Sequence, residues 1–321
     1  MNAAVLRTIN QPPHFAQFPE PVAEENEVIV HVRAAALKPI DKQMASGSHY
    51  AAYSKLPVVC GTDGVGRLDD GTRVFFGGPR PPYGSMAERT VVSRARCFPM
   101  PDNVNDDVAA ALVNPGLSAW GALVWRAQLA PGETVLILGA TGVTGKLAIQ
   151  TAKLLGAGRV IAVGRNEQVA TLHDLGADTI IHLGKPDQDL TEAFVREAGD
   201  SGFDVIIDYL WGPTTEALLA AFVRRDLKPA SSRVRLVEVG ESAGPTISLA
   251  AAVLRSSRLE ILGAGSGNAA ASPEIWIEAV RQLMSNVACG ALRIDTKRVP
   301  LDEVENAWQR EQQGRRAVIT P

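Results

Sequence analysis

From residue 134 onward, the chain alternates short apolar runs with helix-like stretches. The apolar runs lie at 134–138, 159–163, 179–182, 203–208, 233–239 and 259–263. Strands that alternate with helices form parallel sheets, because each connection must carry the chain back to the same edge of the sheet. Six such strands complete two mononucleotide-binding halves. The pattern therefore predicts an α/β fold with a doubly wound parallel sheet.

The residues before 118 have a different character. Short strand-like runs alternate with turn residues, as in 27–37 and in 64–76, where Asp70-Gly71 marks a hairpin turn. Two amphipathic helices are predicted near the C-terminus, at 273–287 and 301–314, and we expect them to pack on this first part. The predicted organisation is a β-rich domain at 1–117 and 267–321, and a dinucleotide-binding domain at 118–266.

Composition excludes several partners. The 321 residues carry a formal net charge of -3 with no long basic run, which argues against nucleic acid as the main partner. No run of about 18 apolar residues occurs, so no membrane span is expected. Cys60, Cys97 and Cys289 are too few and too scattered for a disulfide framework or a zinc pair. We expect a protein of the reducing cytoplasm.

A glycine-rich turn links the first run of the parallel sheet to a helix. The sequence reads TVLILGATGVTGKLA over 134–148. Gly139 permits a tight turn, Gly142 lets the backbone approach a pyrophosphate, and Gly145 allows close packing of helix on strand. The free N–H groups at the start of the helix favour phosphate. The alternative is a plain strand–helix turn whose glycines serve packing alone.

The end of the second run decides between NAD(H) and NADP(H). An NAD site carries an acid there, about 20 residues after the glycines, to accept the ribose hydroxyl. This chain has Gly164, Arg165 and Asn166 instead. A glycine leaves room for a 2′-phosphate and an arginine supplies its counter-charge. We therefore predict NADP(H), the alternative being that Arg165 is a solvated loop charge near Glu167.

These motifs, taken together, resemble the medium-chain dehydrogenase/reductase superfamily, in its zinc-free, quinone oxidoreductase-like branch that includes zeta-crystallin. The markers occur in the order of the family at 34–50, 57–66, 114–123, 132–145, 203–212 and 254–265. The resemblance implies a GroES-like catalytic domain, a Rossmann domain and a nicotinamide in the cleft between them. It also implies a homodimer formed through the last Rossmann strands, here 259–263.

The resemblance also locates the positions that hold catalytic zinc in the zinc-dependent relatives. Those positions carry Cys, His and Cys in the relatives, and Lys38, Thr62 and Pro115 in this chain. Neither lysine nor proline is a plausible zinc ligand, so we expect no metal. Without a Lewis acid, reduction of a conjugated carbonyl or a quinone is easier than reduction of a simple ketone, because the anion that forms is delocalised.

Two side chains are candidates for the chemistry itself. Lys38 would place an ammonium where zinc would sit and would stabilise an oxyanion; alternatively it pairs with Asp41 or Asp63, or binds a cofactor phosphate or ribose. Tyr50 aligns with a tyrosine that related enoyl reductases are thought to use as proton donor, with Tyr53 as a second candidate. For both tyrosines the alternative is an apolar ring at the substrate mouth.

The remaining candidate contacts with the cofactor include the turn residues and, by the resemblance, positions around the nicotinamide. They are Ser118, Gly139, Thr141, Gly142, Val143, Gly145, Gly164, Arg165, Asn166, Leu210, Gly240, Gly265, Ser266 and Arg315.

The leading interpretation is an NADPH-dependent reductase of quinones or α,β-unsaturated carbonyls that works by hydride transfer without a metal. The alternative is a non-enzymatic NADPH-binding protein, a role that zeta-crystallin has in the lens. A zinc alcohol dehydrogenase is disfavoured, because the ligand positions are not filled by ligands.

Overall fold

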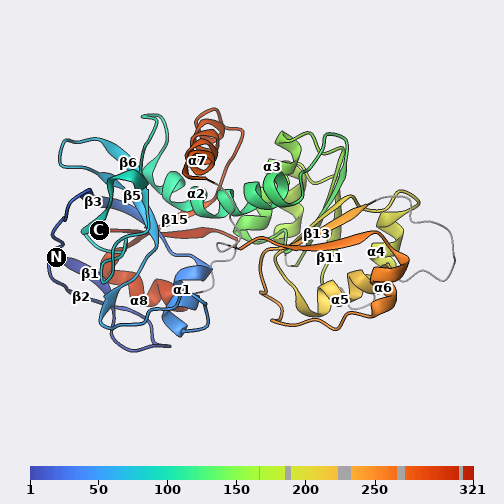
Figure 1. Cartoon of the computed structure of the whole chain (residues 1–321), viewed down its shortest axis with the longest axis horizontal. Helices are drawn as coiled ribbons and strands as arrows, with labels where there is room; N and C mark the ends of the chain where they lie inside the picture. The colour runs from blue at the N-terminus through green and yellow to red at the C-terminus, as the bar shows by residue number, and fades with distance from the viewer. Residues whose placement is uncertain (166, 185–188, 223–232, 266–271, 311–313) are drawn as a thin grey trace. The chain divides into compact units, whose positions relative to one another are not determined.

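The computed structural model describes residues 1–165, 167–184, 189–222, 233–265, 272–310 and 314–321 (Figure 1). The described chain divides into two compact units, 1–114 with 274–321, and 115–273. The predicted boundary at 117/118 lies within a helix, and the one at 266/267 lies outside the described residues.

The first unit is built from antiparallel strands. A seven-stranded sheet has the order β15-β16-β3-β5-β6-β8, with β7 paired to β3, and a smaller sheet has the order β2-β1-β4. The strands of this unit are β1 (Asn2–Leu6), β2 (His14–Gln17), β3 (Glu27–Ala36), β4 (Val58–Val59), β5 (Asp63–Arg67), β6 (Arg73–Gly77), β7 (Arg89–Ser93), β8 (Cys97–Pro99), β15 (Thr296–Pro300) and β16 (Arg316–Thr320).

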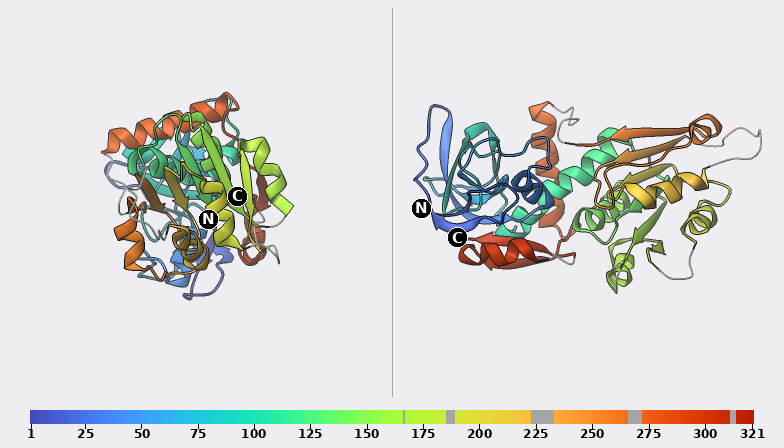
Figure 2. Two further views of the ribbon diagram at one scale, coloured as in Figure 1. Left: turned by 90° about the vertical axis from the view of Figure 1, so that its right-hand side faces the viewer. Right: turned by 90° about the horizontal axis from the view of Figure 1, so that it is seen from below.

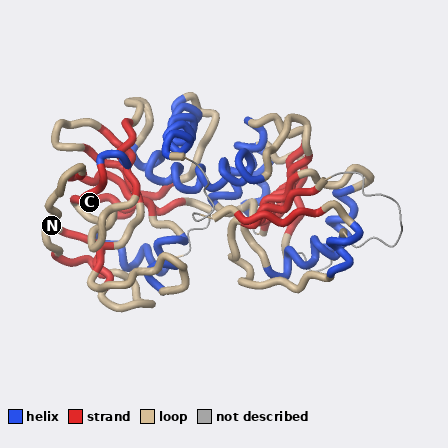
Figure 3. The backbone as a smooth tube through the Cα atoms, viewed as in Figure 1, coloured by secondary structure: helices blue, strands red, loops and turns tan. Residues whose placement is uncertain are grey.

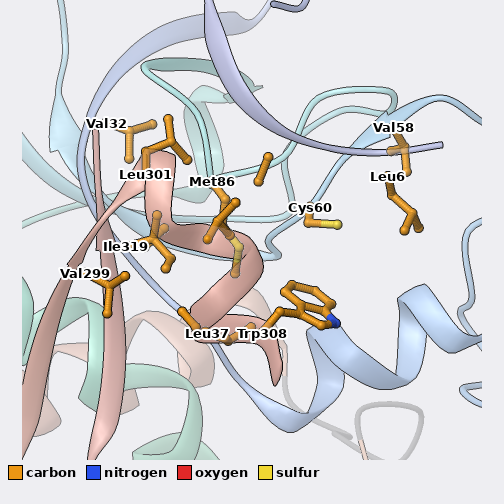
Figure 4. Close-up of a cluster of buried hydrophobic side chains, with 14 of the residues drawn as sticks. Leu6, Val32, Leu37, Val58, Cys60, Met86, Val299, Leu301, Trp308 and Ile319 are labelled. Atoms are coloured by element: carbon orange, nitrogen blue, oxygen red, sulfur yellow. The ribbon is translucent and has the colours of Figure 1, made fainter. Parts of the chain in front are cut away.

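Few helices accompany these strands. They are α1 (Pro39–Ser46), α7 (Pro273–Ala288), α8 (Val304–Gln309) and the short 3₁₀ turns at Arg94–Arg96 and Leu301–Glu303. Segments from both ends of the sequence share one apolar core (Figure 4), in which Leu6, Cys60 and Met86 meet Trp308 and Ile319. Residues 274–321 thus belong to the same compact unit as residues 1–114.

The second unit contains a six-stranded parallel sheet with the order β11-β10-β9-β12-β13-β14. Figure 3 draws the strands in red and the helices in blue. The register pairs Val135 with Val160 on one side of β9 and with Val205 on the other. The strands are β9 (Thr134–Leu138), β10 (Arg159–Gly164), β11 (Thr179–His182), β12 (Val205–Asp208), β13 (Val234–Glu238) and β14 (Leu259–Gly263). This is the strand order of a doubly wound dinucleotide-binding fold, so the predicted fold class is confirmed.

Helices cover both faces of this sheet (Figures 1 and 2). They are α3 (Val143–Leu154), α4 (Leu190–Ala198), α5 (Gly212–Ala221), α6 (Ala251–Ser256) and the 3₁₀ segment Glu167–Leu175. The strands are apolar on both faces because both are covered. Phe194 from α4 and Leu218 from α5 pack with Leu136 and Ile206 in the core on one face.

Helix α2 (Asp106–Trp120) contains the boundary between the two units and continues as a π-helical segment, Gly121–Arg126. Among the described residues, this stretch is the one long and apolar enough to cross a membrane by length and composition. In the structure, 61% of its apolar window is buried, as is typical of a helix in a protein core.

Candidate functional site

The parallel sheet has one switch point, at β9. Its neighbours β10 and β12 lie on opposite sides, so the connections that follow β9 and β12 leave the sheet in opposite directions. A crevice at the carboxyl ends of such strands is where open α/β sheets bind ligands. The glycine turn at 139–145 follows β9 directly, which places it at this position.

The turn has the geometry that the sequence predicts. Gly139 has φ +81°, a left-handed conformation that side chains disfavour. Its N–H and that of Ala140 both donate to the carbonyl of Val163, at 3.0 and 2.8 Å. A Cβ atom at Gly145 would lie 2.4 Å from the Gly139 carbonyl oxygen. The packing roles expected of Gly139 and Gly145 therefore agree with the structure.

Helix α3 presents an uncapped N-terminus. Gly142 is its N-cap and makes no side-chain hydrogen bond to the first turn. That turn also contains no acidic residue. An N-terminus with free N–H groups and the positive end of the helix dipole fits a phosphate. At Gly142 the backbone is extended, and an added Cβ would meet only the Gly139 oxygen, at 3.3 Å. The space beside the Gly142 Cα therefore lies on the outer side of the turn.

Strand β10 ends beside the same turn. A Cβ at Gly164 would lie 2.6 Å from Cγ2 of Thr141, so packing on Thr141 is a second reason for this glycine, besides room for a phosphate. Arg165 is exposed, and Asn166 lies outside the described residues. Val143 is buried at the start of α3.

The loop after β12 is fixed by a buried carboxylate that the sequence analysis did not single out. Asp208 accepts the N–H groups of Leu210 and Trp211 at 2.8 and 2.9 Å, and the hydroxyl of Thr215 at 2.5 Å. Burial raises the pKa of Asp208, although these hydrogen bonds oppose the shift. Trp211 and Gly212 follow with φ of 55° and 63°. An acidic residue at the end of a strand, directly before a turn, is the sequence feature that could have identified Asp208.

Asp208 thereby brings Leu210 to the glycine turn. A Cβ at Gly139 would lie 3.1 Å from Cδ2 of Leu210. Gly240, after β13, donates its N–H to the Asp208 carbonyl at 3.2 Å. The structure thus gathers Gly139, Leu210 and Gly240 at one end of the sheet.

The remaining residues predicted to contact the cofactor have no such contacts with Gly139, Leu210 or Gly240 among the described residues. Ser118 is half-buried in α2 and Gly265 is exposed after β14, while Ser266 lies outside the described residues. Arg315 is exposed, whereas its neighbour Arg316 is buried in the first unit. The role of Arg315 at the cofactor stays a prediction.

Lys38 lies in a buried cluster of four charged groups in the first unit. Its side chain is 1% exposed, and Nζ donates to Asp63 at 2.8 Å and lies 3.7 Å from Asp41. Burial raises the pKa of Asp41 and lowers that of Arg316 to about 10, while the two carboxylates oppose the shift at Arg316. The structure therefore favours the ion-pair alternative for Lys38, and its catalytic role stays a prediction.

The three zinc-ligand positions do not form a metal site. Thr62 donates to Asp41 and Asp63 at 3.3 Å, so it completes the charged cluster. Among the described residues, no three His, Cys, Asp or Glu side chains gather where they could hold a metal ion. An ammonium bonded to a carboxylate occupies the place of the first ligand, so the residues present do not fit zinc.

The two candidate tyrosines have different environments. Tyr50 is 74% exposed and its ring stacks on that of His49, with centroids 4.1 Å apart. His49 Nδ1 accepts the N–H of Ala51 at 3.0 Å, which leaves the proton of the neutral ring on Nε2. Tyr53 is half-buried and packs against the apolar core of the first unit, and burial raises its pKa. Of the two, Tyr50 has the hydroxyl that a substrate can reach.

The chain is similar in sequence to known oxidoreductases. Residues 143–285 match the family model described as zinc-binding dehydrogenase. The chloroplastic NADPH-dependent alkenal/one oxidoreductase of Arabidopsis thaliana is 32% identical over 206 residues, which cover 59% of this chain and 51% of that protein. A quinone oxidoreductase of Rattus norvegicus is 27% identical over 228 residues, which cover 68% and 66% of the two chains.

The fold comparison extends over the whole chain. The quinone oxidoreductase of Thermus thermophilus, solved also as a complex with NADPH, has a TM-score of 0.81 and 27% identity, with 100% of both chains covered. The chain spans about half the length of the alkenal/one oxidoreductase that it matches. These similarities confirm the resemblance to the quinone oxidoreductase-like medium-chain dehydrogenases/reductases.

Proposed function

We propose that this chain, a homologue of quinone and alkenal/one oxidoreductases, is an NADPH-dependent reductase of quinones or α,β-unsaturated carbonyl compounds. The observation that carries the proposal is the turn at the switch point, where Gly139, Gly142 and Gly145 leave an uncapped helix N-terminus open to a phosphate. Gly164 at the end of β10, where an NAD site carries an acid, and Arg165 directly after it support NADPH over NADH.

NADPH, when bound, supplies a hydride to the β-carbon of an enone or to a quinone. The chain then has two tasks, to hold the acceptor oxygen and to deliver one proton to the anion. Tyr50 is the proposed proton donor, because its hydroxyl is exposed and its ring is held on His49. No metal takes part in this proposal, since Lys38 and Thr62, at two of the three zinc positions, bond to Asp63 and Asp41 instead.

The test is NADPH oxidation by the purified protein, with 9,10-phenanthrenequinone and a simple enone as parallel acceptors. We expect turnover with at least one, and the ratio of the two rates identifies the preferred class. Tight NADPH binding without turnover on either acceptor would favour the non-enzymatic alternative. A stoichiometric zinc content in the active protein would contradict the metal-free chemistry.

The choice of NADPH can be tested at one side chain. Replacing Arg165 with alanine is expected to weaken NADPH binding by about tenfold and to leave NADH binding within about twofold, because one charge-assisted hydrogen bond to phosphate is removed. Fluorescence titration of both nucleotides measures this. Arg159→Ala, at the start of β10 and bonded to Glu197, is the matched control. Equal losses for the two nucleotides would show that Arg165 does not read the 2′-phosphate.

We also propose that the protein forms a homodimer and works in the cytoplasm. In the described structure, β14 pairs with β13 on one side only, and Ile261 on it is 37% exposed. An uncovered strand edge is a template for pairing with another chain. Ile261→Asp is expected to convert a dimer into a monomer in light-scattering measurements at micromolar concentration. Val195→Asp, at an exposed residue of α4, is the control and should remain a dimer. If both variants were monomers, or both were dimers, the proposed interface would be contradicted.

A further inference from the structure

Tyr209 is a tyrosine whose buried hydroxyl has no hydrogen-bond partner in the described part of the chain. The hydroxyl of Tyr209 is shut off from solvent, yet it makes no hydrogen bond with any residue that the structure describes. Tyr83, by contrast, donates its hydroxyl to the Glu20 carbonyl at 3.1 Å. A buried hydroxyl without a partner destabilises the protein that carries it, so its presence calls for an explanation.

The position of Tyr209 separates it from the other unpaired hydroxyls. Ser85 and Thr90 belong to the first unit, and Thr151 lies in the third turn of α3, away from the N-terminus that faces a phosphate. Tyr209 directly follows β12, at the carboxyl end of the sheet. Among the four, it is the hydroxyl at the strand ends where this fold binds its ligand.

The backbone of Tyr209 is fixed on both sides. Its N–H donates to the Leu138 carbonyl at 3.3 Å, and its carbonyl accepts the hydroxyl of Ser242 at 2.8 Å. The Tyr209 Cβ lies 3.2 Å from where a Cβ on Gly139 would be. The ring therefore starts against the glycine turn itself, and burial, which raises the pKa of Tyr209, keeps the hydroxyl protonated as a donor.

The strand order indicates which half of a bound dinucleotide would lie at the end of β12. The pyrophosphate lies at the turn after β9, and the adenosine ribose is read at the end of β10, on one side of β9. The nicotinamide half must then lie on the other side, over the ends of β12 and β13. Tyr209 follows β12, so it lies beside that half.

We propose that the Tyr209 hydroxyl donates a hydrogen bond to the nicotinamide half of bound NADPH, at a ribose hydroxyl or the adjoining phosphate oxygen. The inference rests on the proposed function, because it requires the site to bind NADPH. It explains the unpaired hydroxyl, since the group is satisfied when the cofactor is present. It also gives a tyrosine a cofactor-binding role that the glycine pattern does not reveal.

The test compares Tyr209→Phe with the unaltered protein, using two ligands and no turnover. NADPH carries both halves, whereas 2′,5′-ADP carries only the adenosine half. Loss of one neutral hydrogen bond is expected to weaken NADPH binding roughly three- to tenfold, with 2′,5′-ADP binding unchanged. The melting temperature of the NADPH-free variant is expected to stay the same or rise by roughly 1–3 °C, because no bond is lost. Tyr83→Phe is the matched control, with both affinities unchanged.

The outcomes separate this inference from the proposed function. If the unaltered protein binds neither ligand, the proposed function fails. If it binds both and Tyr209→Phe binds NADPH as well as before, the function stands and the role of Tyr209 is overturned. Equal losses for both ligands, or a melting temperature several degrees lower without cofactor, would also overturn it, because either result means that the hydroxyl has a structural partner in the free protein.

Discussion

Replacing Gly145 with alanine is expected to destabilise the second unit and to weaken NADPH binding together. The new Cβ would lie 2.4 Å from the Gly139 carbonyl oxygen and 2.7 Å from the Ala140 Cα, so α3 must move away from β9. Such overpacking costs about 1–3 kcal/mol, and more where both partners are backbone. Since the moved atoms form the phosphate turn, we expect at least about tenfold weaker binding, measured by nucleotide titration and urea unfolding.

Gly142→Ala, three residues earlier in the same turn, is the matched control. Gly142 has φ -69° and ψ 160°, which any residue adopts, and an added Cβ would meet only the Gly139 oxygen, at 3.3 Å. We expect its free energy of unfolding to stay within about 1 kcal/mol of the unaltered value. NADPH binding should still weaken, because the Cβ enters the space of the phosphate. A Gly145→Ala protein as stable as Gly142→Ala would contradict the packing argument.

Lys38→Met is expected to lower the free energy of unfolding by about 3–5 kcal/mol at neutral pH, because it leaves two carboxylates buried with one cation fewer. Nζ of Lys38 bonds Asp63 at 2.8 Å and lies 3.7 Å from Asp41. Lys42→Met, on the same helix and only half-buried, controls for the change of side chain and should cost far less. The measurement is the urea midpoint of each variant at pH 8.

The loss of stability in Lys38→Met should be larger at high pH than at low pH. Burial holds the folded pKa of Asp41 above its unfolded value, and removal of the Lys38 charge raises it further. The folded state then binds more protons than the unfolded state above about pH 4, so stability falls as pH rises through that window. Lys38→Met should therefore be closer to the unaltered protein at pH 5 than at pH 8. A loss that is equal at both values would contradict a buried charge imbalance.

A double variant separates stability from catalysis. Lys38→Met with Asp63→Asn removes one charge of each sign and leaves Asp41 with Arg316, so we expect most of the stability to return. Turnover of this folded variant then tests the electrophile hypothesis directly. Unchanged turnover would show that Lys38 is a structural ion-pair partner, and a large loss of kcat with normal NADPH affinity would restore its catalytic role.

The fold of the second unit was predictable because it depends on local patterns. Apolar runs that alternate with helices fix a parallel sheet, and three glycines at fixed spacing fix the turn after its first strand. The structure places Gly139 at positive φ and Gly145 against backbone, as expected from their positions in the turn. The β-rich unit was predictable only as a class, since its pairing joins segments from both ends of the chain.

The doubly wound sheet, the glycine turn and the charges near it could be predicted from the amino-acid sequence, because these follow from residue types at short separations. Which polar groups have partners depends instead on how distant segments pack together. Lys38 and Asp63 are 25 residues apart, and Arg316 joins their cluster from the far end of the chain. Burial then sets how much each group contributes to stability: it makes the ion pair between Lys38 and Asp63 costly to break, and it leaves the hydroxyl of Tyr209 without a hydrogen-bond partner among the described residues.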